Sequence, residues 1–415
     1  MMWEPDAGEV LNSRYELVER IGDGGFSVVW RARNDRGDVV AIKHPNPNAG
    51  KSQQAIEKYF QRELNSLQAI EQAGGHPNIM SLHETFTEKG TEFMAVEYVD
   101  GQLMEELAGM GDHSQVVDIG IQTCDIFSHI HDLELVYRDL KPDNIMITDS
   151  GRVVLIDFNT ARHRARCGEC GQTINFDNLD SDHCPNCNEE LDSGTVIRAG
   201  ARGQSKYKPP EVANAVGRQG PWSDVYSIGK LLNFLLLGFV RPLPGRNPQE
   251  DHDDCPNFLG EIVVRATRHD PTERYRNASI MKRALENQTA DPTLPEAVLE
   301  NLETGRRLSV GPGDTIGRKN SSGPYSTIEI DDPTDEKLIS RVHARFDISS
   351  EGWIIVDQSK NGTAIDDGSG WRPIIAEDSY DGPAEDAPPQ YSVLEEGTKI
   401  GIHRPNDGEQ FVFHT

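Results

Sequence analysis

The sequence YRDLKPDNIMI at Tyr137–Ile147, with LIDFN following at Leu155–Asn159, decides the fold of this chain. Within this stretch stand a carboxylate, an ammonium, an amide and a second carboxylate: Asp139, Lys141, Asn144 and Asp157. Transfer of a phosphoryl group needs these chemical types. A carboxylate orients and deprotonates the attacking hydroxyl, oxygen ligands bind Mg²⁺, and an ammonium neutralises the phosphoryl charge. The stretch therefore predicts a site for phosphoryl transfer.

The segment before this stretch carries two further features of a phosphate site. Glycines allow backbone amides to approach phosphate oxygens, and the hairpin IGDGGFSVVW holds three of them: Gly22, Gly24 and Gly25. Taken alone, this hairpin is explained equally well as a plain β-turn. Lys43 stands inside the apolar strand VVAIKH and needs a partner, because an unpaired buried ammonium is costly. Glu63 on the next helical segment can supply it, although a solvated helix face is the alternative for Glu63.

Periodicity divides the chain into parts. Residues 14–100 alternate apolar and polar side chains around glycine turns and contain one helical segment, whereas helical spacing dominates after His113. Residues 289–300 have the composition of a linker. Beyond them, short strands and turns predict an all-β module at 301–415. Residues 1–13 are expected to be an N-terminal extension.

In order and spacing, the motifs resemble the eukaryotic-type (Hanks-type) serine/threonine protein kinase family over residues 14–288. The resemblance implies an α+β bilobal fold within a multidomain chain. It also implies binding of ATP with Mg²⁺ (or Mn²⁺), transfer of the γ-phosphoryl group to protein hydroxyls, and pairing of Lys43 with Glu63. The ATP site that it implies comprises Ile21, Gly22, Gly24, Gly25, Val29, Ala41, Lys43, Val96, Glu97 and Val99.

The same resemblance assigns a role to each polar residue of the opening stretch. Asp139 would be the catalytic base, and Asn144 and Asp157 would bind the metal ion. Lys141, two residues after the base, is typical of the serine/threonine class. Four positions would be structural, with Arg138 beside the activation segment, Glu211 paired with Arg274, and Asp224 bracing the catalytic loop.

Three places depart from the family's pattern. Tyr137 replaces the usual histidine before the base, and Asn159 replaces the glycine that completes the metal-binding triplet. We expect Asn159 to keep Asp157 correctly aimed, because asparagine tolerates left-handed backbone angles better than most residues. Gln204 or Ser205 stands near the usual threonine. An alternative is therefore a phospho-dependent signalling scaffold with a weakly active or inactive kinase fold, and a third is an atypical kinase for a small molecule or RNA.

A cysteine-rich insertion interrupts the kinase pattern at residues 164–197. Its four cysteines form two C-x₂-C pairs: Cys167, Cys170, Cys184 and Cys187. Each pair can bind one side of a tetrahedral ion, so the insertion predicts a zinc-ribbon-like knuckle with structural Zn²⁺. Iron, disulfides and unliganded thiols are the alternatives. The insertion lies between Asp157 and Glu211. Its metal ion would therefore either order the activation segment, or only stabilise the local fold or form a docking surface.

The all-β module carries the motifs TIGRKN, LISRVHARF and SKNGTAI, which together resemble the forkhead-associated (FHA) family. The resemblance implies a β-sandwich whose loops bind phosphothreonine, and the alternative is a sandwich with an inactive pocket. The implied contacts are Arg318, Ser340 and Arg341 to the phosphate and Asn361 to the ligand backbone. Scaffold residues of the loops would be Gly317, His343, Gly362 and Thr363.

Together, the two resemblances imply two kinds of partner. The kinase domain would act on protein substrates, and the FHA domain would bind a phosphothreonine-containing protein. That protein is either a primed substrate or an autophosphorylated segment of this chain or a second copy, for which Thr160, Thr173 and Thr195 are candidates.

The charge of the chain disfavours several classes of partner. Lys and Arg number 41 against 68 Asp and Glu, a formal net charge of −27. So acidic a surface repels phosphates, and we expect no nucleic-acid partner and no membrane association. Excess carboxylates with few lysines predict a salt-adapted, halophilic protein, the alternative being an ordinary acidic one. The longest apolar run, Leu231–Val240, is about half of a membrane span. Since no signal peptide is visible, we expect a cytoplasmic location.

Overall fold

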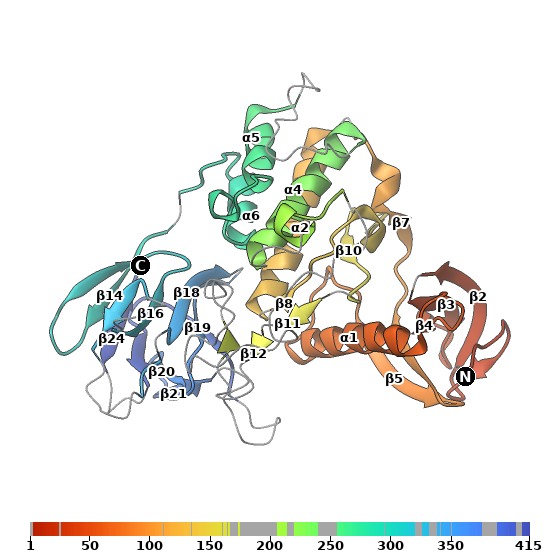
Figure 1. Cartoon of the computed structure of the whole chain (residues 1–415), viewed down its shortest axis with the longest axis horizontal. Helices are drawn as coiled ribbons and strands as arrows, with labels where there is room; N and C mark the ends of the chain where they lie inside the picture. The colour runs from red at the N-terminus through yellow and green to blue at the C-terminus, as the bar shows by residue number, and fades with distance from the viewer. Residues whose placement is uncertain are drawn as a thin grey trace. The chain divides into compact units, whose positions relative to one another are not determined.

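The computed structural model divides the chain into two compact units, whose elements are drawn in Figure 1. Unit 1 comprises Met1–His163, Gln204–Pro209 and Ser223–Arg274. Unit 2 comprises Arg164–Gly203, Pro210–Trp222 and Tyr275–Thr415. The structure describes every residue except 1–2, 25, 111, 134, 160, 164, 167–172, 175–205, 214–219, 240–254, 294, 320–325, 332–337, 341, 350, 376–387 and 404–408.

Unit 1 begins with a six-stranded antiparallel sheet in the order β1-β2-β3-β4-β6-β5. The strands are β1 (Val10–Leu11), β2 (Tyr15–Asp23), β3 (Ser27–Arg33), β4 (Val39–Pro45), β5 (Leu82–Glu88) and β6 (Thr91–Glu97). Helix α1 (Gln53–Gln72) follows β4 and starts at Ser52, whose hydroxyl accepts a hydrogen bond from the backbone N–H of Ala55. Residues 14–100 thus form strands with one helix, as their periodicity predicts.

The second part of unit 1 is mainly helical and carries the catalytic stretch between its helices. The helices are α2 (His113–Asp132), α4 (Pro221–Leu237) and α5 (Asn257–Ala266). At Gly229 an added Cβ would lie 2.8 Å from the Cβ of Ala266, so glycine permits the close approach of α4 and α5. The short elements are β7 (Gly101–Leu103), η1 (Met104–Leu107), β8 (Leu135–Val136), η2 (Pro142–Asn144), β9 (Ile145–Thr148), β10 (Val153–Leu155), β11 (Arg162–His163) and η5 (Pro271–Glu273).

Unit 2 contains a sandwich of two β-sheets, in the orders β15-β14-β24-β23-β20-β21 and β17-β16-β18-β19-β22. One apolar core joins them, since Phe411 and Phe413 of the first sheet cluster with Phe346 and Trp353 of the second. The all-β prediction is confirmed. The strands are β14 (Ala297–Asn301), β15 (Arg307–Val310), β16 (Thr315–Arg318), β17 (Ile328–Ile330), β18 (Ala344–Ser349), β19 (Gly352–Asp357), β20 (Thr363–Asp366), β21 (Arg372–Ile374), β22 (Tyr391–Val393), β23 (Lys399–Ile402) and β24 (Gln410–His414).

Strand β14 begins inside the segment that we predicted to be a linker, residues 289–300. Its side chains Ala297 and Leu299 are buried, and the strand pairs with both β15 and β24. The sequence there is rich in polar residues and proline up to Pro295, which obscured the start of the strand. The β-sandwich therefore includes the last residues of the predicted linker.

Further short elements of unit 2 are α3 (Pro210–Ala213), α6 (Ala278–Glu286), and the paired strands β12 (Ala165–Arg166) and β13 (Thr173–Ile174). Asn277 begins α6, since its side-chain oxygen accepts a hydrogen bond from the N–H of Ile280 at 3.0 Å. The same side chain donates at 2.7 Å to Asp347 of β18. One buried amide thus starts α6 and ties it to the sandwich. None of the helices in the described part of the chain combines the length and apolar character needed to cross a bilayer.

Candidate active site

A buried carboxylate holds the loop that carries Asp139. Asp224, near the start of α4, is fully buried. Its Oδ2 accepts a hydrogen bond from the backbone N–H of Tyr137 at 2.9 Å, and its Oδ1 accepts one from Arg138 at 2.8 Å. The Nε2 atom of His131 lies 3.0 Å from Oδ2. Arg138 has a φ of 76°, a left-handed conformation that is rare for a side chain of this size. The carboxylate thus fixes a strained backbone directly before Asp139.

The catalytic loop brings two of the predicted polar residues, Asn144 and Asp139, into contact. The Nδ2 atom of Asn144 donates to the backbone carbonyl of Asp139 at 2.9 Å. Lys141 lies 3.3 Å from Asp143, and an additional cation, Lys208, lies 3.6 Å from the Asp139 carboxylate. Our sequence reasoning did not include Lys208. The only signal for it is its place in the KYKPPE motif, which gives no side-chain direction.

The predicted pair of Lys43 and Glu63 lies in the interior of unit 1. Their Nζ and Oε1 atoms are 2.5 Å apart, and the two side chains are 6% and 1% exposed. Burial disfavours the ammonium, but the carboxylates of Glu63 and Asp157 outweigh it and raise the pKa of Lys43. Burial also raises the pKa of Glu63, because desolvation outweighs the attraction of Lys43. Lys43 therefore stays protonated, and acid weakens the pair by protonating Glu63.

Asp157 is held at both its backbone and its carboxylate. The hydroxyl of Tyr137 donates to its backbone carbonyl, and the backbone N–H of Phe158 donates to Glu63 at 3.4 Å. Asn159 donates to both carboxylate oxygens, from its backbone N to Oδ1 at 3.0 Å and from Nδ2 to Oδ2 at 2.9 Å. We expected Asn159 to be suited to a left-handed backbone, but its φ is not among the positive ones. Its role here is instead to hydrogen-bond the carboxylate.

Asp157 and Asn144 fit a hard divalent cation by their chemistry, because carboxylate and amide oxygens are ligands that Mg²⁺ accepts. In the described part of the chain, no cluster of three or more His, Cys, Asp or Glu side chains is placed to hold a metal ion on its own. A carboxylate with one amide oxygen instead suits an ion whose remaining ligands come from nucleotide phosphates and water.

The glycine-rich turn between β2 and β3 is a tight hairpin. Gly22 pairs with Val29, and an added Cβ at Gly22 would lie 3.3 Å from the Cβ of Val29. The N–H of Gly24 donates to the carbonyl of Ser27 at 2.9 Å. Ser27 occupies the last position of the G-x-G-x-x-G pattern that kinases use here. Gly25 lies outside the described residues.

Two residues predicted for the ATP site, Ala41 and Val96, lie opposite each other on neighbouring strands. Ala41 of β4 pairs directly with Val96 of β6, and both are buried, as is Val99. The Glu97 side chain pairs with Arg152. Ile21 is 46% exposed, so its side chain is open to solvent at the edge of β2. The register of β4 with β6 therefore places an apolar wall beside Lys43.

The remaining predicted structural residues belong to different units. In unit 1, the guanidinium of Arg274 donates to the carbonyls of Arg268 at 2.7 Å and His269 at 3.0 Å, and it lies 4.8 Å from the ring centre of Tyr226. In unit 2, Glu211 of α3 is buried. The predicted pairing of Glu211 with Arg274 stays a prediction.

The predicted phosphothreonine residues gather on loops at one end of the sandwich. The N–H of Arg318, at the end of β16, donates to the carbonyl of Ser340 at 3.0 Å. The Ser340 hydroxyl accepts from the N–H of Lys360 at 3.3 Å, and Asn361 donates from its side chain to the carbonyl of Leu338 at 2.8 Å. Arg341 lies outside the described residues. Three of the four predicted contacts are thus on loops linked to one another.

His343 is a structural residue of these loops, as predicted from its motif. Its Nδ1 accepts a hydrogen bond from the N–H of Ser340 at 3.2 Å, so its Nε2 carries the proton and faces the carbonyl of Gly362 at 3.1 Å. The side chain is fully buried. One neutral imidazole therefore connects the loop of Ser340 to the loop of Asn361.

The cysteines of the predicted knuckle, Cys167, Cys170, Cys184 and Cys187, lie outside the described residues. So do Thr160, Thr195, Gln204 and Ser205, which the sequence analysis singled out in the same region.

Comparison with known families accounts for most of the chain. Residues 15–286 match the protein kinase domain, and residues 315–374 match the FHA domain. The solved structure entitled "PpkA-294 apo form" superposes with a TM-score of 0.51 at 20% identity, over 68% of this chain and 99% of that one. This likeness supports the fold alone.

Three curated relatives are bacterial serine/threonine kinases. A probable serine/threonine-protein kinase of Clostridium perfringens is 25% identical over 307 residues, covering 69% of this chain and 40% of the relative. PknB of Mycobacterium tuberculosis is 27% identical over 356 residues, covering 80% and 52%, respectively. PrkC of Bacillus subtilis is 26% identical over 296 residues, covering 66% and 40%. The chain spans about half or less of the length of these relatives.

The contact between Asn159 and Asp157 makes a prediction about metal affinity. Replacing Asn159 with Gly or Ala removes the Nδ2 donor that competes for Oδ2, so both variants should bind Mn²⁺ or Mg²⁺ roughly threefold to tenfold more tightly with nucleotide present. Calorimetric titration of the metal into the full chain with ADP measures this. Equal affinity in the wild type and the Asn159→Ala variant would show that the donor does not compete.

Proposed function

The chain belongs to the protein kinase family, and from this membership we propose that it transfers the γ-phosphoryl group of ATP to serine or threonine hydroxyls of proteins. The observation that carries the proposal is the joint placement of the Lys43–Glu63 ion pair and of a catalytic loop fixed by Asp224. The names of the bacterial relatives support the serine/threonine class.

Each of the polar side chains of the site has a role in the proposed phosphoryl transfer. Asp139 would orient the substrate hydroxyl and accept its proton. Lys43, kept protonated by two carboxylates, would hold the phosphates of ATP. Asn144 and Asp157 would hold Mg²⁺ or Mn²⁺, which supplies charge neutralisation on the phosphates when bound. Lys141 would neutralise the transferred group. Lys208 must leave the Asp139 carboxylate, or share it, when a substrate hydroxyl approaches.

One observation favours the second candidate, a phospho-dependent scaffold with a weakly active or inactive kinase fold. Both carboxylate oxygens of Asp157 accept hydrogen bonds from Asn159, which the metal would have to displace. Exchange of one hydrogen bond is a small cost, about 1 kcal/mol, beside the binding of a divalent cation with its nucleotide. We therefore favour the active kinase.

A turnover assay separates the two candidates. Asp139→Asn should lower phosphoryl transfer by roughly a hundredfold or more, because general-base catalysis contributes about that factor. The measurement is transfer from labelled ATP to the chain itself and to a mixture of generic protein substrates. Asp149→Asn, which changes an exposed carboxylate outside the loop, is the matched control and should leave the rate unchanged. Equal background signals from wild type and Asp139→Asn would favour the scaffold.

We further propose that the FHA domain binds phosphothreonine, in a primed substrate or in an autophosphorylated segment of a kinase chain. Support comes from the loops that hold Arg318, Ser340 and Asn361 together. Charge-assisted hydrogen bonds to a phosphate are strong, so Arg318 should dominate the binding energy.

Binding of phosphothreonine peptides by the full chain tests this assignment. Arg318→Ala should weaken binding at least roughly tenfold, as expected for loss of a charged contact. The probes are peptides of this sequence centred on phosphorylated Thr173 or Thr195, followed by fluorescence anisotropy. Arg307→Ala removes an exposed arginine of β15 and serves as the matched control. Equal affinity for the unphosphorylated peptides would contradict phosphothreonine reading.

The third part of the proposal is a structural Zn²⁺ bound by the four cysteines of residues 164–197. The C-x₂-C spacing supports it. The purified chain should contain about one zinc per molecule, and Cys184→Ser should lose it, because an S₄ site needs all its thiolates. Elemental analysis measures this, with Cys255→Ser as the control that removes a buried thiol elsewhere. Iron in place of zinc, or no metal with disulfide-linked cysteines, would overturn this part.

The halophilic character and the cytoplasmic location stay predictions, as does the absence of nucleic-acid and membrane partners.

A further inference from the structure

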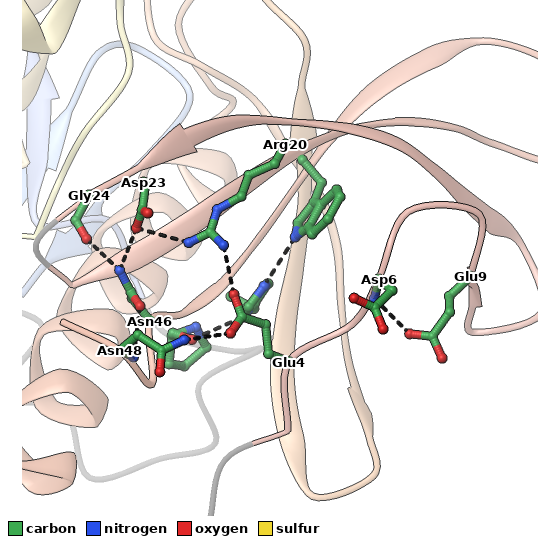
Figure 2. A network of polar contacts seen from close by, with 11 residues as sticks. Glu4, Asp6, Glu9, Arg20, Asp23, Gly24, Asn46 and Asn48 are labelled. Carbon is green, nitrogen blue, oxygen red and sulfur yellow. Dashed lines mark hydrogen bonds and ion pairs between the residues drawn. The ribbon is translucent and has the colours of Figure 1, made fainter.

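The glycine-rich turn is held from outside the nucleotide site by one buried side chain, Asn46 (Figure 2). Asn46 directly follows β4 and is only 3% exposed. Its Nδ2 donates to the carboxylate of Asp23 at 2.8 Å and to the carbonyl of Gly24 at 2.9 Å. Its backbone N–H donates to the carbonyl of Phe26 at 2.9 Å. A single residue therefore bonds the turn on both of its sides.

The orientation of the Asn46 amide is fixed by its own partners. Both N–H groups of Nδ2 donate to the turn. The Oδ1 atom accepts a hydrogen bond from the backbone N–H of Asn48 at 2.9 Å. Turning the amide would face its oxygen toward the Asp23 carboxylate and the Gly24 carbonyl, and its NH₂ group toward the N–H of Asn48, so these three hydrogen bonds would be lost. The amide is thus a rigid connection between the end of β4 and the turn.

The network continues into the segment that precedes the sheet. Arg20 lies 2.9 Å from Asp23 and also 2.9 Å from Glu4, and Asn48 donates to the other oxygen of Glu4 at 2.7 Å. In Figure 2 these side chains converge on Glu4 from β2 and from the residues after β4. Glu4 therefore connects β2 to the residues that follow β4.

This preceding segment is itself anchored on the sheet. The N–H of Trp3 donates to the hydroxyl of Thr91 at 2.9 Å, and that hydroxyl lies 3.1 Å from the Trp3 carbonyl. The Trp3 ring packs edge-on against Phe93, with 6.0 Å between ring centres. Glu4 is thus carried by a fixed backbone and can hold Arg20 in place.

The network also controls a charge. Asp23 stands between two glycines of a turn that must approach the triphosphate, and an unpaired carboxylate there would repel it. Arg20 and Asn46 bind the same oxygen of Asp23. Arg20 supplies a positive charge beside the carboxylate, and Asn46 adds a hydrogen bond that holds the same oxygen.

We propose that Asn46, acting with Arg20 and Glu4, is a positioning residue for ATP: it fixes the glycine-rich turn and holds the Asp23 carboxylate against Arg20. The inference rests on the proposed kinase function, in which this turn covers the phosphates. Neither Asn46 nor Glu4 touches the reacting groups, and both act through the turn.

Nucleotide binding and steady-state kinetics of the full chain test the proposal. Asn46→Ala should raise the Kd and KM for MgATP roughly tenfold, and Arg20→Ala roughly threefold, the factors expected for loss of buried and half-exposed polar contacts. The kcat at saturating ATP should change less than KM, because the chemical groups are untouched. Glu9→Ala is the matched control: Glu9 accepts from the N–H of Asp6 in the same preceding segment but does not contact the turn (Figure 2).

A double variant separates the electrostatic part of the effect. Asp23→Asn removes the carboxylate, so Asn46→Ala combined with Asp23→Asn should bind MgATP more tightly than Asn46→Ala alone. A purely structural role for Asn46 would instead lower the melting temperature and leave the two affinities equal.

The outcomes distinguish this inference from its premise. A wild-type chain that binds no MgATP would overturn the proposed kinase function itself. A wild type that binds MgATP, with Kd and KM unchanged in Asn46→Ala and Arg20→Ala, would overturn the inference alone. If Asn46→Ala does not fold, Arg20→Ala and Glu4→Gln decide: a weakened affinity in both supports the proposal, and wild-type affinity in both overturns it.

Discussion

The carboxylate of Asp224 is the constraint on which the rest of the site depends. It accepts two backbone hydrogen bonds from the residues directly before the predicted base, and it is fully buried. A left-handed arginine costs roughly 1–3 kcal/mol, whereas each hydrogen bond to a charged group contributes about 1.5–3 kcal/mol. The carboxylate can therefore offset the strain at Arg138, and the loop stays in a conformation that it would not adopt alone.

A continuous series of contacts leads from this carboxylate to Lys43, the lysine that we propose binds the phosphates. Tyr137, held through its backbone by Asp224, donates from its hydroxyl to the carbonyl of Asp157. The next residue along the chain, Phe158, donates to Glu63, and Glu63 pairs with Lys43. The tyrosine that departs from the family's usual histidine thus keeps a connecting role. The series passes through the backbone of Asp157, the proposed metal ligand, which lies in its middle.

Sequence reasoning found the members of this series but few of the contacts that join them. Lys43 and Glu63 could be paired in advance, because a lysine in an apolar strand needs a counter-ion and the family resemblance selects Glu63 among the acidic residues of the next helix. The donor from Asn159 to Asp157 could not, since it depends on a rotamer and a backbone angle. Our expectation for Asn159 considered only its tolerance of positive φ.

The contacts that support the glycine-rich turn were missed for the same reason, because they too depend on side-chain conformations that the sequence does not give. Asn46 stands after a strand, a place where polar residues usually face solvent, and nothing in its neighbours marks it as buried. Glu4 and Arg20, which extend its network, lie in different segments and meet only when the segment that precedes the sheet lies on it. The all-β module was easier, because its strands are short, alternating and bounded by turns. Only the start of its first strand, β14, was obscured, because polar residues and prolines precede it.

The net charge of −27 makes the contacts of the carboxylates near the proposed ATP site important. Under the proposed function, an acidic chain must keep its own carboxylates from the phosphates of ATP, and two of the carboxylates near the site have cationic partners. Glu63 is paired with Lys43, and Asp23 with Arg20 and Asn46. Phe26 of the turn stacks on Tyr59 of α1, with 4.0 Å between ring centres, one helical turn before Glu63. The turn is thus connected to α1 through Phe26 and to the end of β4 through Asn46. At Asp23, the contacts that pair the carboxylate are therefore also contacts of the turn.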